Sequence, residues 1–597
     1  MYLLQLVKRR SFLILLLLTV SWGGLIARLW WLQLGFVHHY SARDIDLIKN
    51  AVRQRQQTII LDSGRGEIRD RNGYPFTGGK TLTLVLFPLA RTGMTDASAT
   101  RKLASLIDWP QAKLDEAIRK VKDPLALRDE RGKLVALSTR QAEEINKLQL
   151  PGVLALPVVE RYRPDVTAKQ VIGFVGQNPE LVKQLYPSEL RSGKMSLDSG
   201  IGASGLERSF ERFLQQIEPV RLSYFLDGTG RPLRGLDMRF KQSENSYYPL
   251  SLTTTLDAKI QAKLEQAADR AGLKQGSIVV LDAGSGDVVA MVSRPVYDQS
   301  KVDIAAGDWQ NRAVKQLPPG SVFKIVVAAA ALEEGVAAPT EKFQCTGEYG
   351  KYGFSCWNKE GHGSITMEEA FAQSCNIAFA EIAKRLGGAK IEEYARRLGL
   401  TVPVGWTTNE LYQLKNFRQI DAEESGTVFA PGAPREDEGA LIQTAIGQRD
   451  VRLTPLQAAN LMVTILRGGQ PGQVRLVRDI TYQNGVTFHH FSAQPLAGQG
   501  ISRITAWKLR RFLEQVVQRG TGKSLGSLPW KTAGKSGTAQ VTVQGQQRDH
   551  QWFVGYAPVD KPRYAIAVVA ENQPTRGAHQ GTAVFSSVVE TLASLRE

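Results

Sequence analysis

Residues 318–332 read PPGSVFKIVVAAAAL. Two prolines and a glycine interrupt the preceding structure, and the apolar run 325–332 predicts a buried helix. Ser321 and Lys324 are three positions apart, so on a helix their side chains share one face. An amine held in an apolar site can lose its proton and then accept one from a hydroxyl. The segment therefore predicts a serine nucleophile activated by a lysine.

Two further motifs follow in a fixed order, Ser374-Cys375-Asn376 and Lys535-Ser536-Gly537-Thr538. Alone, an S-x-x-K pair says little in a chain of 597 residues, where such a serine is more often a helix N-cap. The three motifs together resemble the S-x-x-K, S-x-N and K-[ST]-G signature of penicillin-binding proteins and serine β-lactamases. The combination favours a serine acyl-transfer enzyme.

Other segments narrow this resemblance to one class. Residues 534–540 (GKSGTAQ), 445–448 (AIGQ) and 453–457 (LTPLQ) are similar to the transpeptidase domain of penicillin-binding proteins. Residues 65–73 (RGEIRDRNG) and 205–207 (GLE) resemble the non-catalytic pedestal of class B members. Over nearly its whole length the chain thus resembles a class B penicillin-binding protein, a monofunctional peptidoglycan D,D-transpeptidase.

The resemblance implies a mechanism and a set of site residues. Ser321 is expected to attack the carbonyl between the two terminal D-alanines of a stem peptide while Lys324 accepts its proton, and β-lactams would acylate the same serine. No cofactor and no metal are implied. The implied catalytic residues are Ser321, Lys324 and Ser374, and the implied substrate-binding residues are Asn376, Lys535, Ser536, Gly537 and Thr538.

Two positions depart from the family pattern. Relatives often have Gly-Gln-Gly before the Leu-Thr-Pro segment, whereas Arg449 stands in the third place here, which leaves the local loop open. Cys375 lies inside the second motif, where another small residue is common. We expect it to be a packed side chain rather than a nucleophile.

The N-terminus predicts a membrane anchor at residues 11–34. Lys8, Arg9 and Arg10 precede the apolar run, which keeps residues 1–10 in the cytoplasm and places the rest outside, as a single-pass protein of the cell membrane. A cleaved signal peptide has the same start, but the bulky residues 29–32 (LWWL) stand where a cleavage site needs small ones. A retained anchor is therefore favoured.

Beyond the anchor, the sequence predicts an α+β chain of two domains. Residues 35–245 form the pedestal, an elongated mixed module with helices at 96–121, broken at Pro110, and 139–148, and a strand at 82–86. A polar stretch near residues 241–246 marks the boundary. Residues 246–597 form the penicillin-binding, serine β-lactamase-like transpeptidase domain.

Strand patterns at both ends of this second domain define its sheet. A helix from Asp257 to Ala271 precedes a hairpin at 277–292, and a second hairpin at 552–570 precedes a closing helix at 582–595. We expect an antiparallel sheet whose first and last strands meet and which helices cover.

Charge and cysteine content restrict the partners. The net charge of +17 is spread along the chain, which gives no sign of a nucleic-acid site. It supports attraction to anionic lipids and wall polymers, or simply a basic surface. Three cysteines are too few for a disulfide scaffold, although Cys345 and Cys356 could form one bridge in an oxidising compartment. The seven histidines show no spacing suited to zinc.

Two alternatives to a transpeptidase remain open. In the first, the chain is a non-enzymatic scaffold whose pedestal regulates a polytopic peptidoglycan glycosyltransferase, the partner that the class B resemblance implies in any case. In the second, it is a β-lactam sensor or a β-lactamase, for which Glu423 or Glu424 would have to supply the deacylating carboxylate. Their context, residues 421–425 (DAEES), reads more simply as a solvated acidic loop.

Overall fold

The computed structural model describes residues 2–31, 33, 56–94, 96–130, 132–215, 220–225, 239–241 and 247–595. The chain forms two compact units. One takes segments 1–63, 80–159 and 218–243, and the other takes 64–79, 160–217 and 244–597. Both contain helices and strands, as the predicted α+β class requires. The expected domain boundary at residue 245 and the expected end of the anchor at Leu34 lie outside the described residues.

The first helix, α1 (Tyr2–Trp30), begins before the expected start of the anchor at Ser11. Its stretch Val7–Trp30 is long and apolar enough to cross a membrane, with a mean hydropathy of 2.0, and none of it is buried within the chain. An apolar helix without a protein partner needs a lipid environment, so the helix is suited to anchoring the protein in a membrane.

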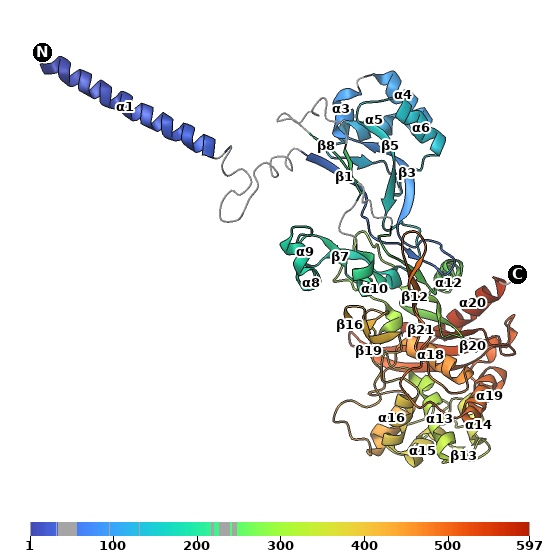
Figure 1. Ribbon diagram of the computed structural model, residues 1–597. Coiled ribbons are helices and arrows are strands. Elements are labelled where there is room, and N and C mark those ends of the chain that lie inside the picture. Colours follow the sequence, from blue (N-terminus) through green and yellow to red (C-terminus); the bar gives the residue numbers. More distant parts are fainter. Residues whose placement is uncertain are drawn as a thin grey trace. The chain divides into compact units, whose positions relative to one another are not determined.

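The first unit joins two small sheets to a group of short helices (Figure 1). One sheet has the order β1-β8-β9 and the other β4-β3-β5. Buried leucines of β3 share a core with the helices. The bounds are β1 (Gln56–Asp62), β3 (Gly79–Leu86), β4 (Leu125–Ala126), β5 (Val153–Glu160), β8 (Val220–Phe225), β9 (Arg239–Lys241), α3 (Pro88–Gly93), α4 (Ala97–Leu106), α5 (Gln111–Lys120) and α6 (Thr139–Lys147).

Capping residues fix these helices where the sequence predicted them. The Asp96 carboxylate accepts a hydrogen bond from the Ser98 amide at the start of α4. Pro110 separates α4 from α5, because proline suits the entry to a helix and not its interior. Ser138 and Gln141 form a reciprocal capping box at α6. The expected strand at residues 82–86 lies within β3.

The second unit is built on a five-stranded antiparallel sheet with the order β12-β11-β21-β20-β19. The two predicted hairpins are confirmed as β11 with β12 and β20 with β21. The first strand, β11, pairs with the last, β21, as expected. The bounds are β11 (Gly276–Asp282), β12 (Val288–Arg294), β19 (Ala533–Val543), β20 (Gln546–Ala557) and β21 (Tyr564–Gln573).

Both faces of this sheet are covered by helices. Successive residues of a strand point to opposite faces, so Ile278 and Val280 pack in a core with α12 (Ala258–Arg270) and α20 (Gln580–Ser594). Val279 and Leu281 belong to the larger core, on the side of α18 (Pro455–Leu466). Burial on both sides explains why residues 278–281 of β11 form a continuous apolar run instead of alternating with polar residues.

Further helices and small strands complete the second unit. Figure 1 shows α13 to α16 and α19 gathered beyond the sheet. These are α13 (Lys324–Glu334), α14 (Met367–Ala372), α15 (Asn376–Leu386), α16 (Gly388–Arg397), α17 (Glu438–Ala445) and α19 (Arg503–Arg519), with α7 (Lys169–Ile172), α8 (Pro179–Leu185), α9 (Pro187–Arg191), α10 (Gly205–Ser209) and α11 (Glu211–Leu214) nearer the N-terminus. The small strands are β2 (Ile68–Arg69), β6 (Val175–Gln177), β7 (Gly200–Gly202), β10 (Ser251–Thr254), β13 (Lys342–Cys345), β14 (Gly363–Thr366), β15 (Thr407–Leu411), β16 (Leu414–Arg418), β17 (Val477–Thr481) and β18 (Thr487–His490).

The two pedestal-like motifs meet in a buried ionic cluster. Arg65 Nε lies 2.6 Å from Glu207 Oε2, and Arg65 Nη2 lies 2.6 Å from Glu211 Oε2. Arg161 contacts the other carboxylate oxygen of Glu207 at 2.6 Å. Glu207 is fully buried, yet the arginines outweigh the burial and lower its pKa. The motif residues 65 and 207 therefore hold the second unit together rather than carrying chemistry.

Replacing Glu207 by alanine should lower the free energy of unfolding by about 3–5 kcal/mol, because two arginines lose a buried partner. The matched control is Glu180→Ala, which breaks an exposed pair with Lys183 and should cost about 1 kcal/mol or less. Urea unfolding of the full chain in detergent measures both. Equal effects of the two substitutions would contradict a structural role for the buried cluster.

Candidate active site

The first motif lies where a tight turn enters a buried helix. Ser321 is in the 3-10 turn Gly320–Phe323, and Lys324 is the first residue of α13. In a 3-10 turn, residues three apart lie on the same edge, so Ser321 and Lys324 face the same side without an α-helix at Ser321. Ser321 is half-buried, and within the described part of the chain its hydroxyl has no hydrogen-bond partner.

Lys324 connects the first motif to the second. Its fully buried amine donates to Ser374 O at 2.7 Å, to Ser374 Oγ at 3.3 Å and to Asn376 Oδ1 at 2.8 Å. Burial lowers the pKa of Lys324 to about 8, because desolvation disfavours the charged amine. This lysine is therefore close to the neutral form that accepts a proton.

The backbone of the second motif is strained. Ser374 has φ +54°, a left-handed conformation that costs a non-glycine residue about 1–2 kcal/mol. This conformation lets both its carbonyl and its hydroxyl reach Lys324. Asn376 begins α15 and its amide donates to Ser355 O at 3.1 Å. The second motif thus binds the Lys324 amine through Ser374 and Asn376, and it binds the loop at Ser355 through the Asn376 side-chain amide.

The third motif lies on the edge strand β19. Lys535 is fully buried, and its amine donates to Ser536 O at 3.1 Å. Desolvation lowers the pKa of Lys535 well below its ordinary value, and repulsion from the nearby Lys324 amine lowers it further. A Cβ on Gly537 would lie 2.5 Å from Pro319 O, so only glycine lets this strand approach the first motif.

Glycines also fix the turn that carries the nucleophile. Gly320 has φ +55°, and a Cβ there would lie 2.2 Å from Thr538 O. Gly320 N–H donates to Gly447 O at 3.0 Å. The segment 445–448 therefore supports the turn from behind, which gives its resemblance to the family a physical reason.

A pocket of about 960 Å³ joins the three motifs. Five of the predicted residues line it, namely Ser321, Ser374, Asn376, Ser536 and Thr538. Lys324 and Lys535 lie behind its wall, and Gly537 packs against the first motif. The structure thus gathers all three motifs around one cavity, with two buried amines beneath an accessible hydroxyl.

The pocket has further lining residues that the sequence did not single out as site residues. His579 caps α20, and its Nε2 lies 3.2 Å from Gly537 O. Thr521 Oγ1 lies 2.8 Å from Ser536 Oγ. Both are distant in sequence from the motifs that they contact. Only the helix start near residue 580 gave a local signal for His579.

Arg449, noted as a departure from the family pattern, also lines the pocket. Its φ is +57°, the left-handed region in which glycine is favoured. The loop thus keeps a glycine-like backbone around an arginine, and the exposed side chain adds a positive charge at the pocket.

The expectation that Glu423 belongs to a solvated loop is wrong. Glu423 is buried, and its carboxylate accepts from the Val404 and Gly405 amides at 2.6–3.1 Å. Burial raises the pKa of Glu423 to about 7. Glu424 lies 2.9 Å from the Lys315 amine. Neither glutamate lines the pocket, so neither is placed to activate a deacylating water.

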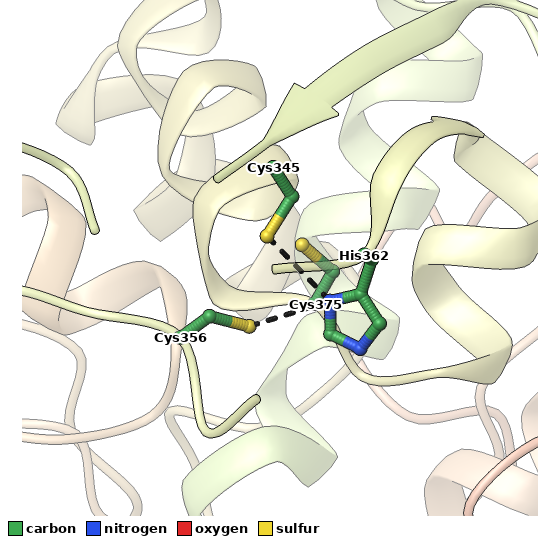
Figure 2. Close-up of side chains that lie close together, drawn as sticks. All are labelled: Cys345, Cys356, His362 and Cys375. Carbon is green, nitrogen blue, oxygen red and sulfur yellow. Dashed lines mark hydrogen bonds between the residues drawn. The ribbon is translucent and has the colours of Figure 1, made fainter. Parts of the chain in front are cut away.

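A cluster beside the second motif corrects the expectation about zinc spacing. Cys345, Cys356 and Cys375 are free thiols, and no bridge joins the first two. Figure 2 shows the three sulfur atoms facing the ring of His362. Cys375 is buried, as expected, but it belongs to a group of four residues that could hold a metal ion.

Two family models match this chain, one in each half. Residues 276–590 match the penicillin-binding protein transpeptidase domain. Residues 60–248 match the penicillin-binding protein dimerisation domain. The two matches together span both halves of the chain beyond its anchor.

Similar proteins cover most of the chain. Stage V sporulation protein D of Bacillus subtilis (strain 168) is 28% identical over 89% of this chain and 77% of its own length. Peptidoglycan D,D-transpeptidase MrdA of Acinetobacter baumannii is 27% identical over 92% and 82%. A chain of the solved structure "Structural coordination of polymerization and crosslinking by a peptidoglycan synthase complex" has a TM-score of 0.64 at 25% identity, covering 98% of both chains.

Proposed function

The chain belongs to the class B penicillin-binding proteins, and on this premise we propose that Ser321 is the nucleophile of a peptidoglycan D,D-transpeptidase. One observation carries the assignment. The Ser321 hydroxyl, which has no hydrogen bond among the described residues, lies on the wall of a pocket of about 960 Å³, one turn from a buried amine that the second motif holds in place. That arrangement suits acyl transfer through a covalent ester.

In the first half of the reaction, Ser321 attacks the carbonyl between the two terminal D-alanines of a stem peptide. Lys324 accepts the hydroxyl proton, since burial favours its neutral form. Ser374, whose Oγ lies 3.3 Å from the lysine amine, passes a proton to the leaving D-alanine. An ester to Ser321 remains. A β-lactam carbonyl would form the same ester without losing a leaving group from the pocket.

In the second half, the amine of a neighbouring stem peptide attacks this ester, and a new peptide bond replaces it. The resulting cross-link releases Ser321 for another cycle. Asn376 and Thr538 line the pocket on two sides and would hold the peptide amide and the terminal carboxylate. Ser536 and Gly537 shape the strand that the peptide follows, and the buried amine of Lys535 would hold the terminal carboxylate together with Thr538.

Backbone amides would stabilise the oxyanion of each step. The first and third motifs approach so closely that a Cβ on Gly320 would touch the Thr538 carbonyl. The N–H groups of Ser321 and Thr538 can then face one carbonyl oxygen from the two sides. Loss of one such donor elsewhere costs about 100-fold or more in rate.

The anchor sets the proposed topology. Residues 1–10 would lie in the cytoplasm, 11–34 in the membrane, 35–245 in the pedestal and 246–597 in the transpeptidase domain outside the membrane. Lys8, Arg9 and Arg10 at one end of the apolar stretch support this orientation. The likeness to a chain of a peptidoglycan synthase complex supports a polytopic glycosyltransferase as partner.

The test uses the full chain in detergent with a fluorescent penicillin, followed for several hours, and in parallel with a stem pentapeptide and an acceptor amine. We expect one stable adduct per chain, and D-alanine release with formation of a cross-linked product. An adduct that disappears within minutes would indicate a β-lactamase instead. A folded chain that forms neither adduct nor cross-linked product would indicate the non-enzymatic scaffold.

A further inference from the structure

We propose, on the basis of the proposed function, that Arg449 selects stem peptides by binding one of their carboxylates other than the C-terminal one. Arg449 lines the catalytic pocket, and its side chain is exposed. Its Nε lies 3.6 Å from Asp450 Oδ2, which is longer than a hydrogen bond, and that oxygen accepts none from the described residues. The guanidinium therefore offers its N–H donors to a ligand in the pocket.

The wall of the pocket carries positive charge and no acidic side chain. Among the described residues that line it there is no aspartate and no glutamate, whereas Arg449 and Lys359 are exposed cations on it. Burial lowers the pKa of His579, which also lines the pocket, so this ring adds little charge at neutral pH. An anionic group that enters the pocket is attracted by the lining residues and repelled by none of them.

The backbone places Arg449 beside the nucleophile. Gly320, which precedes Ser321, donates its N–H to Gly447 O at 3.0 Å, and a Cβ on Gly447 would lie 2.0 Å from Gly320 O. Arg449 follows two residues later, and its carbonyl accepts from Arg452 Nη1 at 2.7 Å. Because the base of the side chain is already fixed, less conformational entropy is lost when the guanidinium binds a ligand.

The conformation of Arg449 favours a role for its side chain. With φ +57°, its backbone is in the left-handed region, which glycine adopts without strain and arginine does not. Such strained residues are found most often at binding and catalytic sites, where the surrounding structure maintains them. An arginine at this position therefore costs backbone energy and gains the pocket a cationic group.

The stem peptide offers a suitable carboxylate in two places. Its isoglutamyl residue has a free carboxylate, and its diamino acid has another when that residue is diaminopimelate. Arginine matches a carboxylate with two parallel N–H···O bonds, a geometry that lysine lacks. The pocket of about 960 Å³ is large enough for more of the peptide than the two D-alanines.

Two penicillins that differ by one carboxylate test the recognition of charge. Carbenicillin is benzylpenicillin with a carboxylate on its side chain, which takes the place of the peptide residue before the D-alanines. Competition with fluorescent penicillin measures the acylation rate constant of each compound on the full chain in detergent. The ratio of the carbenicillin to the benzylpenicillin constant should fall about tenfold in Arg449→Gln. The ratio cancels any general damage to the nucleophile.

Two further variants serve as controls. Arg449→Gly suits the left-handed backbone, so it should fold at least as stably as the wild type and show the same fall in the ratio. Lys359→Gln removes the other exposed cation of the wall and should change the ratio by about twofold or less, because a charge without direct contact is screened by salt. Equal falls in Lys359→Gln and Arg449→Gln, or an unchanged ratio in both Arg449 variants, would overturn the proposal.

Stem pentapeptides with one carboxylate converted to an amide identify the group that is bound. Calorimetry on Ser321→Ala, with and without Arg449→Gln, measures peptide binding without requiring acylation. The peptide with both carboxylates should bind about tenfold more weakly when Arg449 is replaced, and amidation of the bound carboxylate should remove this difference. A difference that survives both amidations, or no difference for any peptide, would contradict the assignment of Arg449. Binding through Arg449 in a chain that penicillin never acylates would count against the proposed function alone.

Discussion

Replacing Ser321 by alanine is expected to abolish covalent labelling of the chain by fluorescent penicillin. The hydroxyl oxygen forms the ester, and no other described side chain of the pocket stands one turn from a buried, readily deprotonated lysine. Because the Ser321 hydroxyl makes no hydrogen bond in the described chain, its loss removes no folding interaction. Thermal unfolding in detergent should therefore stay close to that of the wild type while labelling disappears from the gel.

Ser355→Ala is the matched control for this experiment. Ser355 lines the same pocket, and its hydroxyl accepts from the Lys359 amine at 2.5 Å. Its backbone carbonyl, which holds Asn376, is unchanged by the substitution. The control should label at nearly the wild-type rate. Undiminished labelling of Ser321→Ala, located by peptide mapping at another residue, would refute the assignment of the nucleophile.

Replacing Lys324 by alanine should lower the rate of penicillin acylation by about 100- to 10,000-fold, the usual contribution of a positioned proton acceptor. The substitution removes the amine that accepts the Ser321 proton, and it leaves Ser374 O and Asn376 Oδ1 without their donor. Lys324→Met separates these effects, since methionine fills the buried space without a base. Both variants should be acylated slowly by penicillin. Stopped-flow quenching of the labelled β-lactam measures this acylation rate.

The pH dependence of acylation tests the same role. The pKa of Lys324 is lowered to about 8, so the proton-accepting form grows as pH rises. Below this pKa the rate should increase about tenfold per pH unit, and above it the rate should level off. Lys324→Met should lose this rise. A wild-type rate that is constant from pH 6 to pH 9, or a Lys324→Met variant that acylates at the wild-type rate, would remove the lysine from its proposed role.

Much of this protein was determined by its sequence alone, because local patterns report local structure. The 3.6-residue periodicity predicted the helices α4 to α6 and α12, and apolar runs on either side of turn residues predicted the two hairpins of the large sheet. Caps such as Asp257 marked where helices begin. The order of the three motifs indicated the family, and the proximity of Ser321 to Lys324 followed from their spacing.

Only the tertiary structure decided which distant residues meet. It placed Lys324 against the second motif, Glu423 in a buried site and His362 among three cysteines that no regular spacing connects. It also divided the chain into units whose segments alternate along the sequence. The physical reason is that periodicity extends over one helix or strand, whereas these meetings depend on strand register and on close backbone approach at residues such as Gly320 and Gly361.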